Sequence, residues 1–392
     1  MKRYDIVIAG GAMAGATLAL ALNAYCQDTL SIAVVEPFLA QHEEHPGYDS
    51  RSIALSYGTV ELLKDMQLWS AIKPYAVAIN HIHVSDRGHA GMTDMDANEL
   101  GIDALGYVVE LADTGRVYHE KLQQAANIDF LCPASVTSIE RDSTSVSLLL
   151  SSGETIQAPL LVAADGTQSV CCDDIGLKQT EQDFGQVAVI ANITAEQAHE
   201  GRAFERFTES GPLALLPMSE GRLSLVWCLS PDEANKVLSL SDSQFLVELQ
   251  SAFGWRLGQF TLAGSRASYP LLLRTREQFI SHRVAVIGNA AQTLHPIAGQ
   301  GFNLGIRDVA TLAQEISKAE QDIGDYQLLS CYAKRRNSDR NQTIMLTAGL
   351  VHLFSNDYPA MRIGRNLGLM LMDNVSLVRS PLLRRTMGLV ER

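Results

Sequence analysis

The chain has 392 residues, of which 46% are hydrophobic, and a formal net charge of −13 at pH 7. This length accommodates two domains with sizeable cores, while the acidic balance argues against a nucleic-acid partner. No apolar run in the sequence reaches the roughly 18–20 residues that cross a bilayer. The six cysteines include no C-x-x-C pair, so the sequence predicts no metal site and no disulfide framework, and favours a reducing cytoplasm.

The N-terminal segment is typical of a dinucleotide-binding βαβ unit. Residues 5–9 form a β-rich run, a glycine turn and a small-residue helix follow, and residues 31–35 form a second β-rich run. That run ends at Glu36, 21 residues after the last glycine of the turn, where a carboxylate meets the adenosine ribose. The turn fits G-x-G-x-x-G with an alanine in the middle position, and its residues expected at the pyrophosphate are Gly10, Gly11, Ala12, Met13 and Gly15.

Three positions between residues 51 and 166 are further candidates. Arg51 precedes a helical pattern, where it suits either a phosphate or flavin edge or a solvated loop. Arg116 lies between a strand over 107–111 and a helix expected over 117–126. A buried strand over 160–164 breaks at Asp165, and the carboxyl end of such a strand is where doubly wound folds bind ligands.

Residues 185–270 change character. Five segments in this region alternate or run apolar in the manner of strands, which is typical of a mixed sheet. We interpret the region as a substrate-covering domain inserted into the nucleotide-binding domain.

A second glycine-rich loop follows a short apolar strand over 284–287. It contains Gly288, Pro296, Gly299 and Gly301, and a helix is expected to open at about Asn303. Glycines allow close approach to a ligand, and a helix N-terminus suits an anion or an electron-rich carbonyl. Two such loops far apart in the chain predict an extended dinucleotide held at both ends.

The C-terminal part is helical in pattern from about residue 325. Residues 359–392 carry six arginines against Asp373 and Glu391, a net charge of +4 in an acidic chain, with leucines and methionines between them. A basic amphipathic helix suits a membrane surface or a partner protein. The alternative interpretation, which we favour from the sequence, is an ordinary core-closing helix with outward arginines.

The glycine turn, the Asp165-Gly166 pair and the 288–308 loop, in this order, resemble the class A flavoprotein monooxygenases of the para-hydroxybenzoate hydroxylase fold. Residues 295–308 are similar to the ubiquinone-biosynthesis hydroxylases, above all to the 2-octaprenyl-6-methoxyphenol hydroxylases, and residues 199–208 and 250–258 extend the likeness. The resemblance implies an α/β (α+β) fold: a GR2-type FAD-binding Rossmann-like domain, an inserted mixed β-sheet substrate domain and a helical C-terminus. The expected parts are the FAD-binding domain over 1–75, 101–184 and 271–340, the substrate domain over 76–100 and 185–270, and a C-terminal helical region over 341–392.

The resemblance also implies residue roles. The expected FAD contacts are Gly10, Gly11, Ala12, Met13, Gly15, Glu36, Arg51, Arg116, Asp165, Gly288, Asn289, Gly301, Phe302 and Asn303, with Asp165 supporting the pyrophosphate region. The expected flavin-ring environment is His295, Pro296, Gly299, Gln300 and Gly301, with Tyr269 facing the substrate. Two positions depart from the family pattern, because Asn289 stands where an aspartate is usual and Cys172 where an arginine is frequent.

The implied reaction is aromatic hydroxylation. FAD is reduced by transiently bound NAD(P)H and reacts with O2 to a flavin C4a-hydroperoxide, which hydroxylates a polyprenylated phenol in ubiquinone biosynthesis. A base would make the phenol a better nucleophile. His295 is the nearest candidate in sequence, although a packing role suits it as well, and no base is identified. A cytoplasmic protein, peripheral at the inner membrane through its basic C-terminus and associated with a ubiquinone-biosynthesis complex, is the expected setting.

Two other functions remain open. One is a flavin-dependent reductase or epoxidase of isoprenoid chains, which oxygen-dependent hydroxylation of a phenol would exclude. The other is a non-catalytic flavin-bound scaffold, which substrate-stimulated oxidation of NAD(P)H would exclude.

Overall fold

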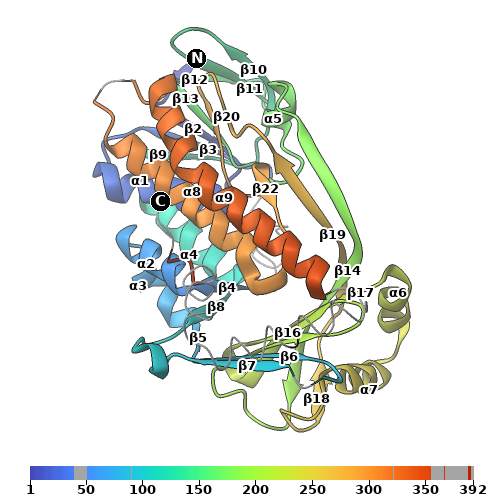
Figure 1. The fold of residues 1–392 in the computed structure, drawn as a ribbon. Coiled ribbons are helices and arrows are strands. Elements are labelled where there is room, and N and C mark those ends of the chain that lie inside the picture. The colour runs from blue at the N-terminus through green and yellow to red at the C-terminus, as the bar shows by residue number, and fades with distance from the viewer. Residues whose placement is uncertain (39–50, 90, 321, 355–365, 367–386, 390–392) are drawn as a thin grey trace.

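The computed structural model describes residues 1–38, 51–89, 91–320, 322–354, 366 and 387–389 (Figure 1). Its first layer is a parallel sheet with the strand order β20-β21-β13-β2-β3-β9, in which only β20 runs antiparallel to its neighbour. The strands are β2 (Ile6–Ala9), β3 (Ile32–Val35), β9 (Ile128–Leu131), β13 (Leu160–Ala163), β20 (Ile280–Ser281) and β21 (Val284–Val286). β2, β3, β13 and β21 are buried along their whole length, which explains why they read as unbroken apolar runs.

Helices and a meander complete this layer. α1 packs on α8, and α8 packs on α9, in front of the parallel sheet (Figure 1). The helices are α1 (Met13–Cys26), α4 (Leu111–Gln124), α5 (Val170–Asp174), α8 (Gln300–Ser317) and α9 (Tyr326–Phe354). The meander β10 (Val136–Arg141), β11 (Val146–Leu150) and β12 (Thr155–Ala158), joined by β1 (Lys2–Arg3), contributes side chains to the same core.

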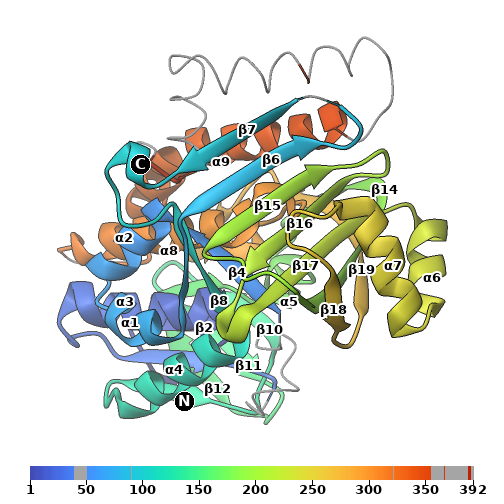
Figure 2. The ribbon, with the colours of Figure 1, turned by 90° about the horizontal axis from the view of Figure 1, so that it is seen from below.

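The second layer is a long mixed sheet with the order β22-β19-β14-β17-β16-β15-β6-β7, and β18 pairs with β14. Its strands are β6 (His81–Asp86), β7 (Met92–Asp96), β14 (Gln179–Ala195), β15 (Arg202–Phe207), β16 (Pro212–Pro217), β17 (Arg222–Leu229), β18 (Phe260–Ala263), β19 (Ala267–Arg276) and β22 (Gln292–Thr293). Figure 2 shows α6 (Pro231–Ser239) and α7 (Asp242–Phe253) against this sheet. A small sheet lies between the layers, formed by β4 (Ser52–Ser56), β8 (Gly106–Glu110) and β5 (Val77–Ile79), with α2 (Tyr57–Asp65) and α3 (Trp69–Ile72) beside it.

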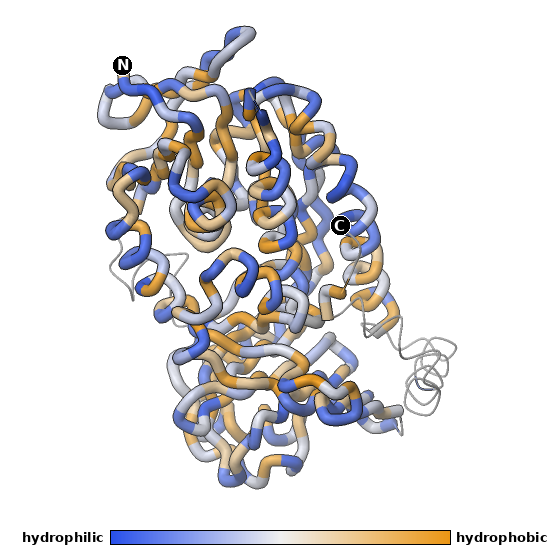
Figure 3. The backbone as a smooth tube through the Cα atoms, turned by 90° about the vertical axis from the view of Figure 1, so that its left-hand side faces the viewer, coloured by the Kyte–Doolittle hydropathy of each residue, from blue (hydrophilic) through white to orange (hydrophobic). Residues whose placement is uncertain are grey.

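The two faces of the mixed sheet differ. Side chains such as Trp227, Leu225 and Leu213 pack against Phe245 and Phe253 of α7 and form a closed core. On the opposite face Ala214 and Val226 are half-buried, whereas Ser224 and Cys228 are buried. Figure 3 shows hydrophobic and hydrophilic residues interspersed along the tube through the described part of the chain.

The expected α/β class with a Rossmann-like sheet is confirmed, and several expected bounds shift. α8 begins at Gln300 rather than near Asn303, because Gly299 adopts a left-handed conformation (φ +58) as its N-cap. α4 begins at Leu111 rather than at 117. The expected boundaries at 184/185 and 340/341 fall inside β14 and α9. Most of the basic segment 359–392 lies outside the described residues.

No helix in the described part of the chain combines the length and hydropathy that crossing a bilayer requires.

A buried charge network joins α8 to α9. Arg336, whose side chain is fully buried, donates to Asp308 at 2.8 Å and to Asp339 at 2.6 Å. Arg307 donates to the same carboxylate of Asp339 at 2.9 Å. Because the charges compensate one another, the network can be buried, but the loss of one member leaves the others unpaired.

The neighbouring arginines of α9 provide a matched test of this network. Arg336→Met should lower the free energy of unfolding by about 3–5 kcal/mol, because it removes the arginine paired with the buried carboxylate of Asp308 and one of the two arginines paired with Asp339. Arg335→Met removes a partly exposed pair with Glu315 and should cost about 0–1 kcal/mol. Urea unfolding followed by tryptophan fluorescence measures both, and equal losses would contradict the assignment.

Candidate functional site

Three turns leave the same edge of the parallel sheet. Ala163 of β13 pairs with Ala9 of β2 on one side and with Val286 of β21 on the other, so the chain segments after these residues emerge side by side. They also touch one another: a Cβ on Gly10 would lie 2.4 Å from the carbonyl oxygen of Ala164. The segments around residues 10, 165 and 288 therefore lie side by side along one edge of the sheet, as the extended-dinucleotide hypothesis requires, and we refer to this shared edge as the trough.

The first turn depends on two glycines. Gly10 has φ +99, and a Cβ on Gly15 would lie 1.9 Å from the carbonyl oxygen of Gly10. This close approach brings the start of α1 directly to the end of β2. α1 begins at Met13 with Ala12 as its N-cap, without a capping side chain and without an acidic residue in its first turn. Such a helix N-terminus suits a phosphate.

Glu36 lies beside this turn. Its side chain is 4% exposed, and its Oε2 accepts the N–H of Gly11 at 2.7 Å while its Oε1 accepts the N–H of Phe38 at 3.0 Å. The structure thus brings Gly11 and Glu36 together. A carboxylate has about four acceptor sites, so Glu36 retains capacity to bind sugar hydroxyls.

Asp165 follows β13 on the second turn. Its Oδ2 accepts the N–H of Cys171 at 3.0 Å, whereas its Oδ1 is buried and has no hydrogen-bond partner among the described residues. A buried carboxylate oxygen without a donor is unfavourable, so a ligand hydroxyl would stabilise it. The expected support of a pyrophosphate suits this carboxylate poorly, because like charges repel. A sugar or ribityl hydroxyl fits better.

The third turn begins at Gly288, which has φ +60 and whose Cβ would lie 2.9 Å from Cβ of Ala14 in α1. Asn289 follows it and is exposed. Asp308 of α8 supports the turn, since its Oδ2 accepts the N–H of Gly288 at 3.3 Å and the amide of Gln292 at 2.7 Å. Sequence analysis assigned no role to Asp308 or Gln292, although Asp308 closes the motif.

The first turn of α8 contains an open position. A Cβ on Gly301 would have no atom within 4 Å, in contrast to Gly10 and Gly15. Gln300 beside it is buried, and Pro296 and Phe302 are half-buried. The free space at Gly301 would accommodate the edge of a planar ring.

The side-chain amide of Asn303 makes three hydrogen bonds within the protein. Its Oδ1 accepts the N–H of Ser56 at 2.9 Å, and its Nδ2 donates to the carbonyls of Ala54 at 2.9 Å and Gly299 at 2.6 Å. The side-chain amide is therefore used by the protein itself. It holds β4 against the start of α8 and positions the loop.

His295 is buried and fully hydrogen-bonded. Its Nδ1 accepts the N–H of Ile297 at 3.1 Å, so the proton lies on Nε2, which donates to Oε1 of Gln186 at 3.1 Å. Burial lowers the pKa of His295 to about 4, and Phe184 packs against its ring. Because the lone pair is already used by a backbone N–H, this geometry favours a structural role over that of a base.

Three other residues that the sequence places at the site have the following surroundings in the structure. Arg51 directly precedes β4, whose Ala54 lies against Gly299. Tyr269 pairs with Ala188 across β19 and β14. Arg116 stacks on the ring of Tyr75 at 4.8 Å and pairs with Asp113 of its own helix at 3.0 Å, so its described partners lie outside the three turns.

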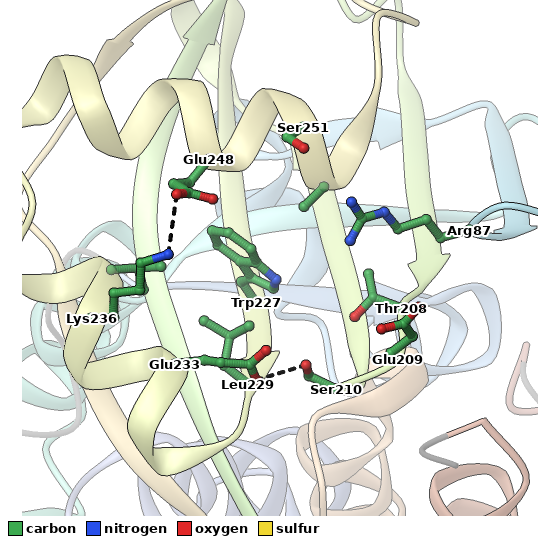
Figure 4. Close-up of a pocket in the computed structure, with 12 residues that line it drawn as sticks. Arg87, Thr208, Glu209, Ser210, Trp227, Leu229, Glu233, Lys236, Glu248 and Ser251 are labelled. Atoms are coloured by element: carbon green, nitrogen blue, oxygen red, sulfur yellow. Dashed lines mark hydrogen bonds and ion pairs between the residues drawn. The ribbon is translucent and has the colours of Figure 1, made fainter. Parts of the chain in front are cut away.

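A cavity on the α6–α7 side of the mixed sheet is separate from the trough. Figure 4 shows Trp227 in its wall, with Lys236 paired to Glu248 at 3.3 Å and Ser210 donating to Glu233 at 2.7 Å. Trp227 belongs to the core that α7 covers, so the cavity lies on the opposite face from the 295–303 loop. Two pairs of its polar groups thus bind one another, whereas the buried indole N–H of Trp227 has no hydrogen-bond partner among the described residues. No cluster of side chains suited to hold a metal occurs within the described residues.

Two glycine variants separate ligand binding from folding. Gly301→Val should leave the thermal unfolding temperature of the ligand-free protein unchanged and weaken FAD binding about tenfold or more, because its side chain fills only the free space. Gly15→Ala should lower the unfolding temperature itself, since its Cβ meets a backbone oxygen. Calorimetry and flavin absorbance measure both quantities, and normal FAD binding by Gly301→Val would exclude a ring at this loop.

Comparison with known proteins supports the dinucleotide hypothesis. The model of a family described as FAD binding domain matches residues 3–347. Ubiquinone hydroxylase UbiL of Rhodospirillum rubrum is 34% identical over 390 residues, covering 99% of this chain and 90% of that protein. The 3-demethoxyubiquinol 3-hydroxylase of Escherichia coli is 30% identical over 394 residues, covering 98% of each.

Solved structures share the fold. The p-nitrophenol 4-monooxygenase PnpA of Pseudomonas putida superposes with a TM-score of 0.81 at 19% identity, covering 99% of both chains. HpxO of Klebsiella pneumoniae, complexed with FAD and uric acid, superposes with a TM-score of 0.76 at 14% identity, covering 98% of this chain and 96% of that one. At these identities the likeness extends to the fold alone.

Proposed function

Because the chain belongs to the FAD-binding-domain family of flavoproteins, we propose that it is an FAD-dependent monooxygenase that hydroxylates a polyprenylated phenol in ubiquinone biosynthesis. The observation that carries the proposal is the trough itself. Three turns border it, and the 295–303 loop faces a half-buried apolar sheet. A dinucleotide along the trough would present its ring between the loop and that sheet.

The residues of the trough fit FAD. Gly10, Gly15 and the N-terminus of α1 would hold the pyrophosphate, and Glu36 the adenosine ribose. The orphaned Oδ1 of Asp165 would accept a hydroxyl of the sugar or ribityl chain. Asn289 carries no charge but can both donate and accept. When bound and reduced by NAD(P)H, the flavin activates O2 and supplies one oxygen atom to the substrate ring.

The residues of the chain would position the reacting groups, exclude water and stabilise developing charge. Backbone N–H groups at the start of α8 would stabilise negative charge on a ring beside Gly301. Phe207, Ile297 and Val351 pack together at the loop and would help to exclude water, which protects reactive intermediates. Asn303 and His295 hold this loop in place through the hydrogen bonds described above.

The substrate class follows from the relatives and the sheet. Both named relatives are hydroxylases of ubiquinone compounds by their printed names. The half-buried apolar side chains of the mixed sheet opposite the loop suit an aromatic ring with an isoprenoid tail. Within this class, the sequence resemblance favours the reaction of the 2-octaprenyl-6-methoxyphenol hydroxylases.

Two measurements test the function. A strain that lacks this chain should accumulate the phenol that the enzyme hydroxylates, and the purified holoenzyme should oxidise NAD(P)H faster with that phenol and transfer one atom of ¹⁸O2 to it. Oxygen-independent reduction of the isoprenoid chain would instead identify a reductase. Unstimulated NAD(P)H oxidation would identify a scaffold.

We also propose that the basic C-terminal segment contacts an anionic membrane surface or a partner of the same pathway. Its net charge of +4 in a chain of −13 supports this proposal. Each basic residue near an anionic surface contributes about 1 kcal/mol. Arg384→Glu combined with Arg385→Glu should therefore reduce co-flotation with phosphatidylglycerol vesicles at least tenfold and leave FAD content unchanged. Unaltered flotation would exclude the membrane contact.

A further inference from the structure

Glu205 is a carboxylate near the middle of β15. Side chains on β15 alternate between the two faces of the mixed sheet. Phe204 packs on Phe253 of α7, and Arg206 donates to the carbonyl of Ala252 at 3.0 Å, so both face the helices. Glu205 lies between them in sequence and therefore points to the opposite face.

That face meets the 295–303 loop. Phe207, two residues after Glu205, clusters with Ile297 of the loop. Ala203, two residues before it, belongs to a cluster that includes Ala54, and Ala54 lies against Gly299. Because residues two apart on a strand share a face, Glu205 lies between two apolar clusters that both reach the loop.

The residues beside Glu205 leave it room. Its register partners are Val84 of β6 and Ala214 of β16, and the row continues through Val226 and Ile190. All four are apolar and half-buried, and so is the Glu205 side chain, while their sequence neighbours on the α7 side are mostly buried. Glu205 therefore retains accessible surface on this face of the sheet.

Glu205 has no hydrogen-bond or ion-pair partner among the described residues. Its burial raises the pKa of its carboxyl group to about 7. Other titratable or charged groups on this face of the sheet or on the opposing loop are Asp86 with His89, the Arg222–Glu110 pair, Cys228, Tyr269 and His295. Asp86 and Arg222 have charged partners of their own, and burial raises the pKa of Cys228 well above its usual value.

We propose, on the basis of the function proposed above, that the Glu205 carboxylate accepts the hydrogen bond of the substrate's phenol hydroxyl and takes its proton. The arrangement suits this role because the Glu205 carboxylate, which has no partner among the described residues, lies among apolar register neighbours on the face that meets the cofactor loop. His295, the other candidate, has its lone pair occupied by the N–H of Ile297. A base that titrates near the working pH is also the most effective one.

The proton and electron balance is closed. As the phenol O–H bond breaks, its proton moves to Glu205 and its electron pair enters the ring, whose carbon forms a bond to the oxygen atom that O2 and the reduced flavin supply. That ring carbon then loses its hydrogen as a proton, which leaves with the second oxygen atom as water. Glu205 returns its proton to the phenol oxygen, and the carboxylate is restored.

A binding measurement without turnover tests the contact. The oxidised FAD holoenzyme is titrated with a short-tailed 2-prenylphenol and with its O-methyl ether between pH 5.5 and 8.5. The carboxylate binds a phenol donor by a charge-assisted hydrogen bond, so the phenol should bind about tenfold more tightly above pH 7 than below it. The ether cannot donate, and its Kd should not change through this transition.

Substitutions assign the transition to Glu205. Glu205→Gln should abolish the pH dependence of phenol binding and lower the hydroxylated product formed per second about 100-fold, with FAD content unchanged. Glu205→Asp should keep the pH dependence with a lower rate. Glu209→Gln, on an exposed residue of the same hairpin, is the matched control and should behave as the wild type.

The outcomes separate this proposal from the function on which it rests. If wild-type enzyme hydroxylates the phenol but Glu205→Gln retains both its rate and its pH dependence, the role of Glu205 is excluded and the function stands. If Glu205→Gln loses flavin, Glu205→Asp decides, because loss of the pH transition there would also exclude the role. If wild-type enzyme hydroxylates no phenol, the proposed function itself fails.

Discussion

The site depends on one buried carboxylate. Asp308 accepts the N–H of Gly288 and the amide of Gln292 through one oxygen, and the guanidinium of Arg336 through the other. It thereby fixes the third turn of the trough to α8 and α9 at once. Because Asp308 and Arg336 are almost completely buried, neither can move without leaving an uncompensated charge. The network thus fixes the third turn relative to the helices that cover the parallel sheet.

The mixed sheet gives the chain two chemically different surfaces from one set of strands. One face is closed by α6 and α7 and has a packed core. The other faces the 295–303 loop with small and half-buried apolar side chains. Alternation alone places Arg206 on the first face and Glu205 on the second. Two adjacent residues of one strand therefore have different roles. Arg206 binds a backbone carbonyl on the α7 side, and Glu205 lies on the side of the proposed site.

The elements of the parallel sheet were predictable from the sequence because their signals are local. Buried strands read as continuous apolar runs, and the glycine turn is recognisable from the spacing of its glycines. The three turns could also be expected to meet, since parallel strands end at a common edge. The start of α8 was less predictable, because a left-handed Gly299 rather than a capping side chain begins the helix.

The individual roles of polar residues were not predictable in the same way. Asn303 and His295 follow the family motif closely, yet their side chains bind Ser56, Ala54 and Gln186, which lie more than 100 residues away in the chain. Arg116 likewise stacks on Tyr75 and pairs with Asp113, neither of which belongs to the three turns. Glu205 gave no signal, because a single glutamate in an alternating strand reads as a solvent-facing residue.

The sequence by itself determined the class of fold, the family and the order of the turns around a dinucleotide, because these follow from periodicity and from glycines at fixed spacing. Only the tertiary structure decided which polar groups remain available to a ligand. Availability depends on whether distant segments already satisfy a donor or acceptor, as they do for Asn303 and His295 and do not for Asp165 Oδ1. That is a property of packing, which local sequence does not encode.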